Sequence, residues 1–190
     1  MSDDIAAQHH AALDATRPVV AGIGDAQMDA STPCAEWDVR ALLNHLIAGN
    51  WWAARLAAGA TIDEVGSIYD GDVLTPTAIA AYDESARAAA RAFEAPGALD
   101  APCAVSYGPV PGSVYAGHRF VDVLIHGWDL ATATGQPSPI TPELADACWR
   151  VVEPQLDMLR GSGMFGSDQS VPEGADSTTR LLLTMGRTPA

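Results

Sequence analysis

The chain has 190 residues, of which 48% are hydrophobic, and it carries a formal net charge of −14. This length suits one domain with a sizeable core, and the apolar content excludes a disordered chain. All ten basic residues are arginines scattered along the sequence, so no basic cluster is present to bind nucleic acid or an anionic membrane.

Alanine is abundant and β-branched residues do not form alternating runs, which favours helices over strands. Asp38 and Thr141 are typical helix N-caps, Gly59 and Gly135 are typical helix ends, and Pro18 should kink or interrupt the first helix. From these signals, helices are predicted, in chain order, at about residues 3–28, 38–59, 76–94, 112–134, 141–161 and 177–187.

Residues 95–111 are rich in proline and glycine, which predicts a loop with a short hairpin around Val105–Tyr107. We therefore expect an all-α fold, a four-helix bundle with extra short helices at the C-terminal end, as a single domain over residues 1–190.

The sequence also indicates where the protein resides. Its three cysteines, Cys34, Cys103 and Cys148, are far apart and form no CxxC motif, which favours reduced thiols. A charged leader and a long apolar run are both missing, so a soluble, cytoplasmic protein is expected. Cys34 lies near a helix N-terminus that could lower its pKa, but a buried structural cysteine is the favoured interpretation.

The segment "HRFVDVLIHGWDL" at residues 118–130 is apolar except for one narrow polar stripe. On a helix, His118, Asp122, His126 and Asp129 fall within roughly a quarter-turn of one another, and Tyr115 lies one turn earlier on the same stripe. Burying such groups without partners costs several kcal/mol, so they must pair with one another, face water or hold a cation.

Aspartate and neutral histidine are both ligands of first-row metals, and an i, i+4 pair places two donors on one helix face. The pairs Asp122 with His126, and His118 with Asp122, have this spacing, and His45 is the candidate ligand from another helix. The alternative is that these are ordinary core or surface histidines. His9 and His10, near the N-terminus, are expected at the surface.

The motifs "TPCAEWDVRALLNHL", "VDVLIHGWDLATATGQP" and "ADSTTRLLLTMGRTP" identify a resemblance that covers residues 30–188. Together they resemble a DinB-like metal-binding family that is widespread in actinobacteria. That family is related to the N-terminal domain of mycothiol-dependent maleylpyruvate isomerase. The resemblance implies a DinB-like up-down four-helix bundle.

The resemblance also implies a divalent metal, zinc or nickel, held between helices by His45, Asp122 and His126. Two departures from the family pattern are visible. The isomerase relatives have a glutamate where this chain has Asp122, and the isomerase carries a C-terminal domain for which this chain is expected to be too short. The maleylpyruvate activity itself is therefore not implied. Asp129 is interpreted as a partner of a ligand, and His118 as a pocket residue or a fourth ligand.

Three functions are compatible with this site. The first is a metal-dependent S-transferase or isomerase that uses a small-molecule thiol, mycothiol or a bacillithiol-like compound, against a small electrophile. In it, Tyr115, His118 and Trp52 would shape the cofactor pocket. The second is a metal-dependent hydrolase with Glu36 or Asp129 as general base. The third is a non-catalytic, stress-associated metal-binding protein, favoured if His118 closes the coordination sphere.

The sequence also bears on assembly. Trp51 and Trp52 are adjacent on the second predicted helix and must point to different faces. A homodimer with one of them at the interface is one interpretation, and an ordinary core role is the other.

Overall fold

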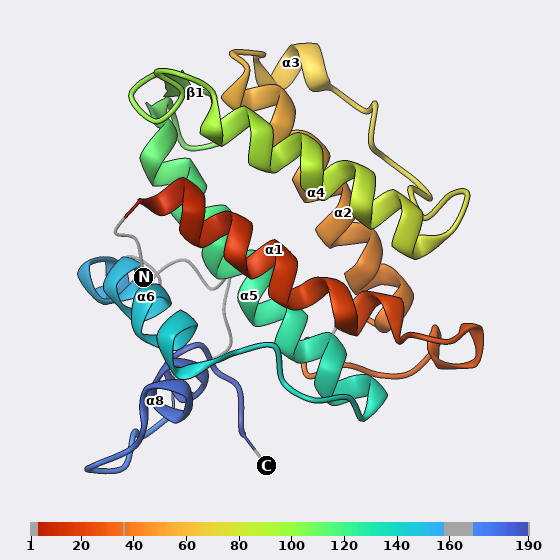
Figure 1. The fold of residues 1–190 in the computed structure, drawn as a ribbon, viewed down its shortest axis with the longest axis vertical. Coiled ribbons are helices and arrows are strands. Elements are labelled where there is room, and N and C mark those ends of the chain that lie inside the picture. The colour runs from red at the N-terminus through yellow and green to blue at the C-terminus, as the bar shows by residue number, and fades with distance from the viewer. Residues whose placement is uncertain (1–3, 36, 158–168, 190) are drawn as a thin grey trace. The chain divides into compact units, whose positions relative to one another are not determined.

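A computed structural model describes residues 4–35, 37–157 and 169–189. The chain divides into two compact units, one extending to residue 139 and the other covering residues 140–190. The predicted all-α class is confirmed, because helices make up both units and the sheet has only two short strands (Figure 1). The single domain expected over residues 1–190 stays a prediction.

The first unit contains the long helices. In chain order, its elements are α1 (Ile5–Ala21), η1 (Asp25–Gln27), α2 (Val39–Ala57), α3 (Ile62–Val65), α4 (Ala78–Glu94), β1 (Pro102–Cys103), β2 (Val110–Pro111) and α5 (Gly112–Thr134). The second unit contains α6 (Pro142–Val152), η2 (Glu153–Gln155) and α8 (Ser177–Thr184), with α6 packed against α8.

In the bundle, α1 and α5 run in one direction, whereas α2 and α4 run in the other. Thr16 and Val19 of α1 contact Val123 and Gln136 in the same order along the chain, so α1 and α5 are parallel. The pairs Arg17 with Asp83 and His10 with Glu94 run in opposite order, so α1 and α4 are antiparallel.

The helices therefore do not alternate in direction along the chain, which corrects the strict up-down order expected above and leaves the four-helix bundle itself unchanged. α2 and α4 point the same way because the connection at residues 58–77, which includes α3, returns the chain along the bundle. Helices of this length span about 27 Å, well within the reach of this connection, which would extend to about 66 Å.

The helix starts follow the predicted caps. Asp38 accepts a hydrogen bond from the Ala41 amide at 2.8 Å, and Thr141 accepts one from the Leu144 amide at 3.3 Å. Each of these bonds satisfies an amide that has no partner within its own helix. At the C-terminal end of α5, Gly135 adopts a φ of 68°, a left-handed conformation that glycine reaches without steric cost.

The first helix differs from the sequence prediction in two ways. It ends at Ala21 rather than near residue 28, because Gly22 and Gly24 follow and the chain continues as the short η1. The prediction that His9 lies at the surface is wrong, because its side chain is 0% exposed and packs edge-on against Phe93. His10 is exposed, as expected.

The hairpin predicted within residues 95–111 is confirmed. β1 and β2 pair antiparallel, with Pro102 opposite Pro111 and Cys103 opposite Val110. Tyr107 lies in the turn between them and is 61% exposed. The hairpin leads directly into α5.

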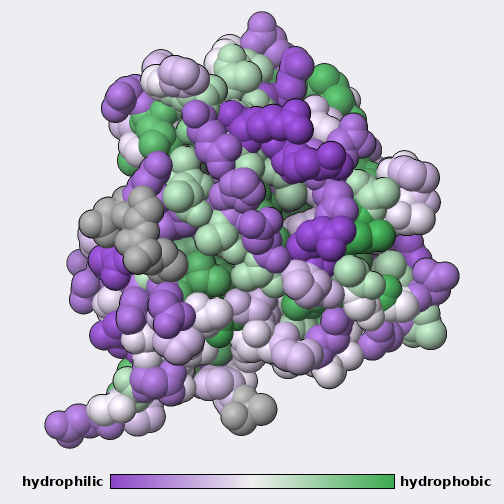
Figure 2. Space-filling model, viewed as in Figure 1, coloured by the Kyte–Doolittle hydropathy of each residue, from purple (hydrophilic) through white to green (hydrophobic). Residues whose placement is uncertain are grey.

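The core of the bundle lies between its four long helices. Its largest fully buried side chains in this unit are Leu42, Leu43, Leu46, Ile47, Tyr82, Phe93, Phe120, Leu124, Ile125 and Leu130. Hydrophilic side chains cover much of the face shown in Figure 2, with apolar side chains between them.

Candidate metal centre

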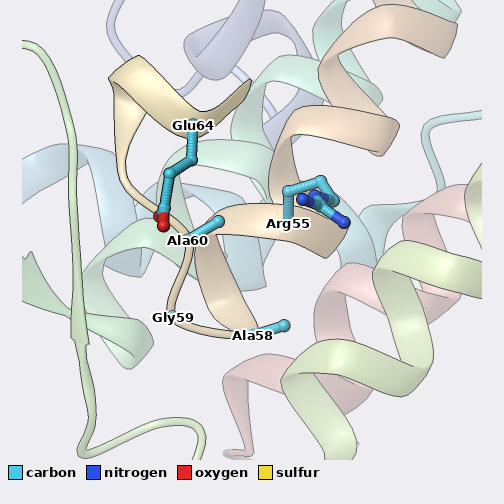
Figure 3. A pocket seen from close by; sticks show the side chains of 5 residues that line it. All are labelled: Arg55, Ala58, Gly59, Ala60 and Glu64. Carbon is cyan, nitrogen blue, oxygen red and sulfur yellow. The ribbon is translucent and has the colours of Figure 1, made fainter. Parts of the chain in front are cut away.

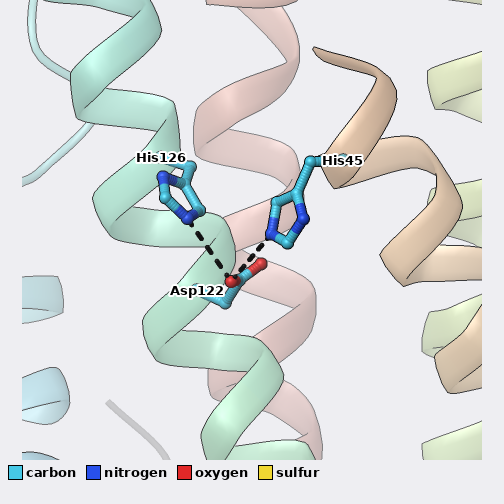
Figure 4. Close-up of side chains that lie close together, drawn as sticks. All are labelled: His45, Asp122 and His126. Carbon is cyan, nitrogen blue, oxygen red and sulfur yellow. Dashed lines mark hydrogen bonds and ion pairs between the residues drawn. The ribbon is translucent and has the colours of Figure 1, made fainter. Parts of the chain in front are cut away.

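Three of the residues singled out in the sequence converge between α2 and α5 (Figure 4). Oδ1 of Asp122 lies 3.2 Å from Nε2 of His45 and 3.5 Å from Nε2 of His126. One donor atom from each residue lies within 4.8 Å of the other two. This is the one such group of histidine, cysteine and acidic residues found within residues 4–35, 37–157 and 169–189.

The convergence follows from helix geometry. Asp122 and His126 are four residues apart on α5, so both side chains project from the same face. α2 runs antiparallel to α5, since His45 contacts Asp122 whereas Asn50, further along α2, contacts the earlier Arg119. This pairing places His45 opposite Asp122 and His126.

The cluster is partly exposed to solvent. The His45 side chain is 34% exposed and that of Asp122 is 22% exposed, whereas that of His126 is only 9% exposed. Solvent therefore reaches His45 and Asp122, whereas His126 is nearly buried.

The buried Arg119 neutralises Asp122. Its Nη1 donates to Oδ2 of Asp122 at 2.8 Å, and its Nη2 donates to Oδ1 of Asn50 at 3.2 Å. Burial alone would raise the pKa of Asp122, but the charge of Arg119, followed by His126 and His45, lowers that pKa well below its usual range. Asp122 is therefore a carboxylate at neutral pH.

His126 has a carboxylate on its other side. Its Nδ1 lies 3.0 Å from Oδ2 of Asp129, which is 0% exposed. Such a carboxylate fixes the ring orientation and favours the proton on Nδ1, so that Nε2 presents its lone pair to the cluster.

Trp37 packs over the two histidines. Its ring centroid lies 4.5 Å from that of His45 and 5.7 Å from that of His126. Thr32 holds this loop by donating a hydrogen bond to the Trp37 carbonyl at 2.7 Å. Sequence reasoning overlooked Trp37 and Arg119, although Trp37 immediately precedes the helix cap Asp38 and Arg119 lies one turn before Asp122.

The other predicted site residues lie outside the three-residue cluster. Nδ1 of His118 is 3.0 Å from the Tyr107 hydroxyl. Tyr115 is buried beside Phe93, and this burial raises its pKa to about 12. Trp52 packs against the same apolar cluster as Tyr115. Glu36, the proposed general base of the hydrolase alternative, lies outside the described residues.

Cys34 and the two adjacent tryptophans also have defined surroundings. Cys34 is half-buried, and its amide donates a hydrogen bond to Thr32 Oγ1 at 3.1 Å. Trp51 stacks on Tyr69 with a ring separation of 5.9 Å. Since both Trp51 and Trp52 pack within the chain, the homodimer stays a prediction.

A separate pocket lies at the far end of α2 (Figure 3). It is lined by Arg55, Ala58, Gly59, Ala60 and Glu64. Since His45 precedes Arg55 by ten residues, the pocket is about 15 Å along the helix from the cluster. The pocket therefore does not include the candidate ligands.

Among the helices of the described residues, none is long and apolar enough to cross a membrane.

The chemistry of the donor set fits a divalent transition metal. In a tetrahedral zinc site with bonds of about 2.0–2.1 Å, neighbouring ligand atoms are about 3.3 Å apart. The separations of 3.2 and 3.5 Å around Oδ1 of Asp122 are close to this value. The same separations also allow direct hydrogen bonds between the carboxylate and protonated imidazoles.

Comparison with known proteins places this chain in a family. An uncharacterized protein of Mycobacterium tuberculosis, found in two strains, is 36% identical over 185 residues, which cover 95% of this chain and 96% of the relative. Two crystal structures of the mycothiol-dependent maleylpyruvate isomerase, one of a histidine-to-alanine mutant, match with TM-scores of 0.62 and 0.63.

Each of these structural matches has 12% sequence identity and covers 82% of this chain and 70% of the isomerase. This likeness shows that the two proteins share a fold, which confirms the predicted DinB-like bundle. Residues 9–131 match the family described as the mycothiol maleylpyruvate isomerase N-terminal domain. Because this match covers more than half of the chain, the chain belongs to the mycothiol maleylpyruvate isomerase N-terminal domain family.

Proposed function

We propose that this protein binds a divalent metal, zinc or nickel, through His45, Asp122 and His126. We further propose that it is a thiol-dependent S-transferase or isomerase that acts on a small electrophile. The thiol is of the mycothiol type, as the name of the family and of the structurally similar isomerase suggests.

The observation that carries this proposal is the convergence of three metal-type donor atoms within 4.8 Å of one another. Three protein ligands leave one position of a tetrahedral site open, which is typical of catalytic rather than structural zinc sites. The partial exposure of His45 and Asp122 supports an opening through which a small molecule reaches that position.

Each residue around the centre has a role in this proposal. Asp129 holds the His126 ring with Nε2 toward the cluster, and Trp37 covers the two histidines and limits the access of water. A divalent ion, when bound, would supply Lewis acidity that favours the thiolate form of an incoming thiol. In an isomerisation, the thiol adds to the electrophilic carbon and is later expelled, so it is not consumed.

The proposed contacts for the body of the thiol are Trp52, His118 and Tyr115. Trp52 and Tyr115 each lie seven residues from a ligand on the same helix, so they are about 10 Å from the centre along α2 and α5. His118, half-buried beside Tyr107, occupies the α5 turn between Tyr115 and Asp122. A thiol with a bulky polar body is long enough to reach from the centre to these side chains.

The hydrolase alternative is less well supported. A general base must reach a water molecule beside the metal. Asp129 is fully buried and bonded to His126, an arrangement that suits the support of a ligand rather than the removal of a proton from water.

The direct test is to titrate zinc-loaded protein with mycothiol and then to add a panel of small electrophiles. We expect saturable thiol binding and either a conjugate or an isomerised product. His10→Ala, which changes an exposed histidine away from the cluster, should behave as wild type, whereas His126→Ala should lose both properties. Loaded wild-type protein that neither binds the thiol nor turns over any electrophile would refute the proposal.

A further inference from the structure

Arg119 is a buried cation directly beside a proposed metal ligand. Arg119 is 7% exposed, and its guanidinium contacts both Asp122 and Asn50. Gly49 makes room for it, because a Cβ atom at that position would lie 2.5 Å from Nη1 of Arg119. Burying a guanidinium is costly, so its location next to the centre requires a reason.

Metal binding alone does not supply that reason. A positive charge next to a carboxylate ligand repels an incoming cation and lowers the affinity of the carboxylate for it. A site selected only for tight metal binding would therefore be expected to lack this arginine. The two oxygens of Asp122 are also divided, since Oδ2 accepts from Arg119 while Oδ1 faces the two histidines.

The charges around the centre can be counted from these contacts. The carboxylate of Asp122 and the guanidinium of Arg119 cancel each other, and histidine ligands are neutral. A divalent ion then adds two positive charges. When the carboxylate of Asp129 is also counted, the net charge of the centre is one positive charge. A site with little solvent exposure favours the binding of one anion that neutralises this charge.

We propose, on the basis of the metal site proposed above, that Arg119 sets the charge of the centre so that its open position selects a monoanion over a neutral ligand. A thiolate is a monoanion, whereas water and a protonated thiol are neutral. Arg119 thus acts through the charge of the centre and is not itself a catalytic residue.

A purely structural role for Arg119 gives a different expectation. If the guanidinium only held Asp122 in place, its loss would weaken metal binding and would leave the preference for anions unchanged. If the guanidinium sets the charge of the centre, its loss does not weaken metal binding but does weaken the binding of anions. Asp129→Asn provides the opposite change, because it removes a negative charge near His126 with almost no change in shape.

The test uses cobalt(II)-loaded protein and thiocyanate as the monoanion probe. Chelator competition gives the metal affinity, and the visible absorption of cobalt gives the thiocyanate affinity. We expect Arg119→Gln to weaken thiocyanate binding by about tenfold or more without weakening cobalt binding. Asp129→Asn should strengthen thiocyanate binding, and Arg119→Lys and Asn50→Ala, which retain the charge, should stay within about threefold of wild type.

Wild-type protein alone should bind thiocyanate more tightly than the neutral probe imidazole, which keeps the test decisive if Arg119→Gln does not fold. Equal wild-type affinity for the two probes, or an unchanged thiocyanate affinity in folded Arg119→Gln, would overturn the inference while leaving the metal site intact. Wild-type protein that binds no cobalt would overturn both this inference and the proposed function.

Discussion

Nδ1 of His126 lies 3.0 Å from Oδ2 of Asp129, one turn further along α5 and fully buried. This contact places a carboxylate behind one histidine of the cluster, on the side opposite to Asp122. It thereby determines which ring nitrogen faces the proposed metal, and it extends the site beyond the three ligands.

Removing that carboxylate should weaken metal binding. We expect Asp129→Ala to lower zinc affinity by about 10- to 100-fold, because the His126 ring loses the partner that orients it. Asp129→Asn, which keeps an acceptor for Nδ1, should show a smaller loss. Chelator competition measures both variants, and an Asp129→Ala protein with wild-type affinity would show that the contact does not support a ligand.

Trp37 should report metal binding by fluorescence. Its ring lies 4.5 Å from that of His45, so a paramagnetic ion such as cobalt(II) in the cluster would be close enough to quench its emission. We expect cobalt to quench part of the wild-type fluorescence and to lose most of that effect in Trp37→Phe. The same degree of quenching in Trp37→Phe would place the bound ion elsewhere in the protein.

The close packing of α1 on α5 depends on Gly127. A Cβ atom there would lie 2.4 Å from Oγ1 of Thr16, so Gly127→Ala must displace the Thr16 side chain or push the two helices apart. We expect the free energy of unfolding to fall by about 1–2 kcal/mol, after allowing for the better helix propensity of alanine.

Thr16→Ala provides the matched test, since it removes the two atoms that the new methyl group would meet most closely, Oγ1 and Cγ2 of Thr16. In a double-mutant cycle followed by urea unfolding, it should recover about 0.5–1 kcal/mol of the loss in Gly127→Ala. Strictly additive effects would show that these two residues do not limit the approach of the helices.

His9 should make the bundle sensitive to acid. Burial, followed by the charge of Arg119, lowers the pKa of His9 from 6.5 to about 3, and neither ring nitrogen has a hydrogen-bond partner among the described residues. Between pH 6.5 and 3 the unfolded chain therefore binds a proton that the folded protein does not. Stability contributed by neutral His9 is present above pH 6.5 and is lost as the pH falls toward 3.

The variant His9→Leu should lose this dependence. Urea unfolding at several pH values between 7 and 4 gives the free energy of unfolding as a function of pH. The slope of this free energy against pH should be smaller in His9→Leu than in wild type, by up to about 1.4 kcal/mol per pH unit. His10→Ala, on the exposed face of the same helix, serves as the control for general acid effects. Identical slopes in wild type and His9→Leu would mean that His9 is protonated or solvated in the folded state.

Local signals predicted most of the fold. Asp38 and Thr141 act as the caps that their positions indicated, and Gly135 ends α5 in a left-handed conformation. These features depend on residues close in sequence, so the sequence alone predicts them. The end of α1 was predicted too late, because the apolar pattern continues past Gly22 although the helix does not.

The cluster was only partly predictable. The four-residue spacing of Asp122 and His126 follows from one helix, and His45 could be chosen because it is the histidine of the second predicted helix. Trp37 and Arg119 take their roles from the packing of a loop and of α2 against α5, which no local pattern encodes. His9 was misplaced for the same reason, since it is buried by Phe93 of α4.

In the proposed function, His45, Asp122 and His126 hold one divalent ion. The most direct measurement is elemental analysis combined with zinc titration of protein purified without a histidine tag. We predict one equivalent of metal per chain in wild type and in His10→Ala, and nearly none in His45→Ala and His126→Ala. Equal metal content in all four proteins, or none in wild type, would contradict the account.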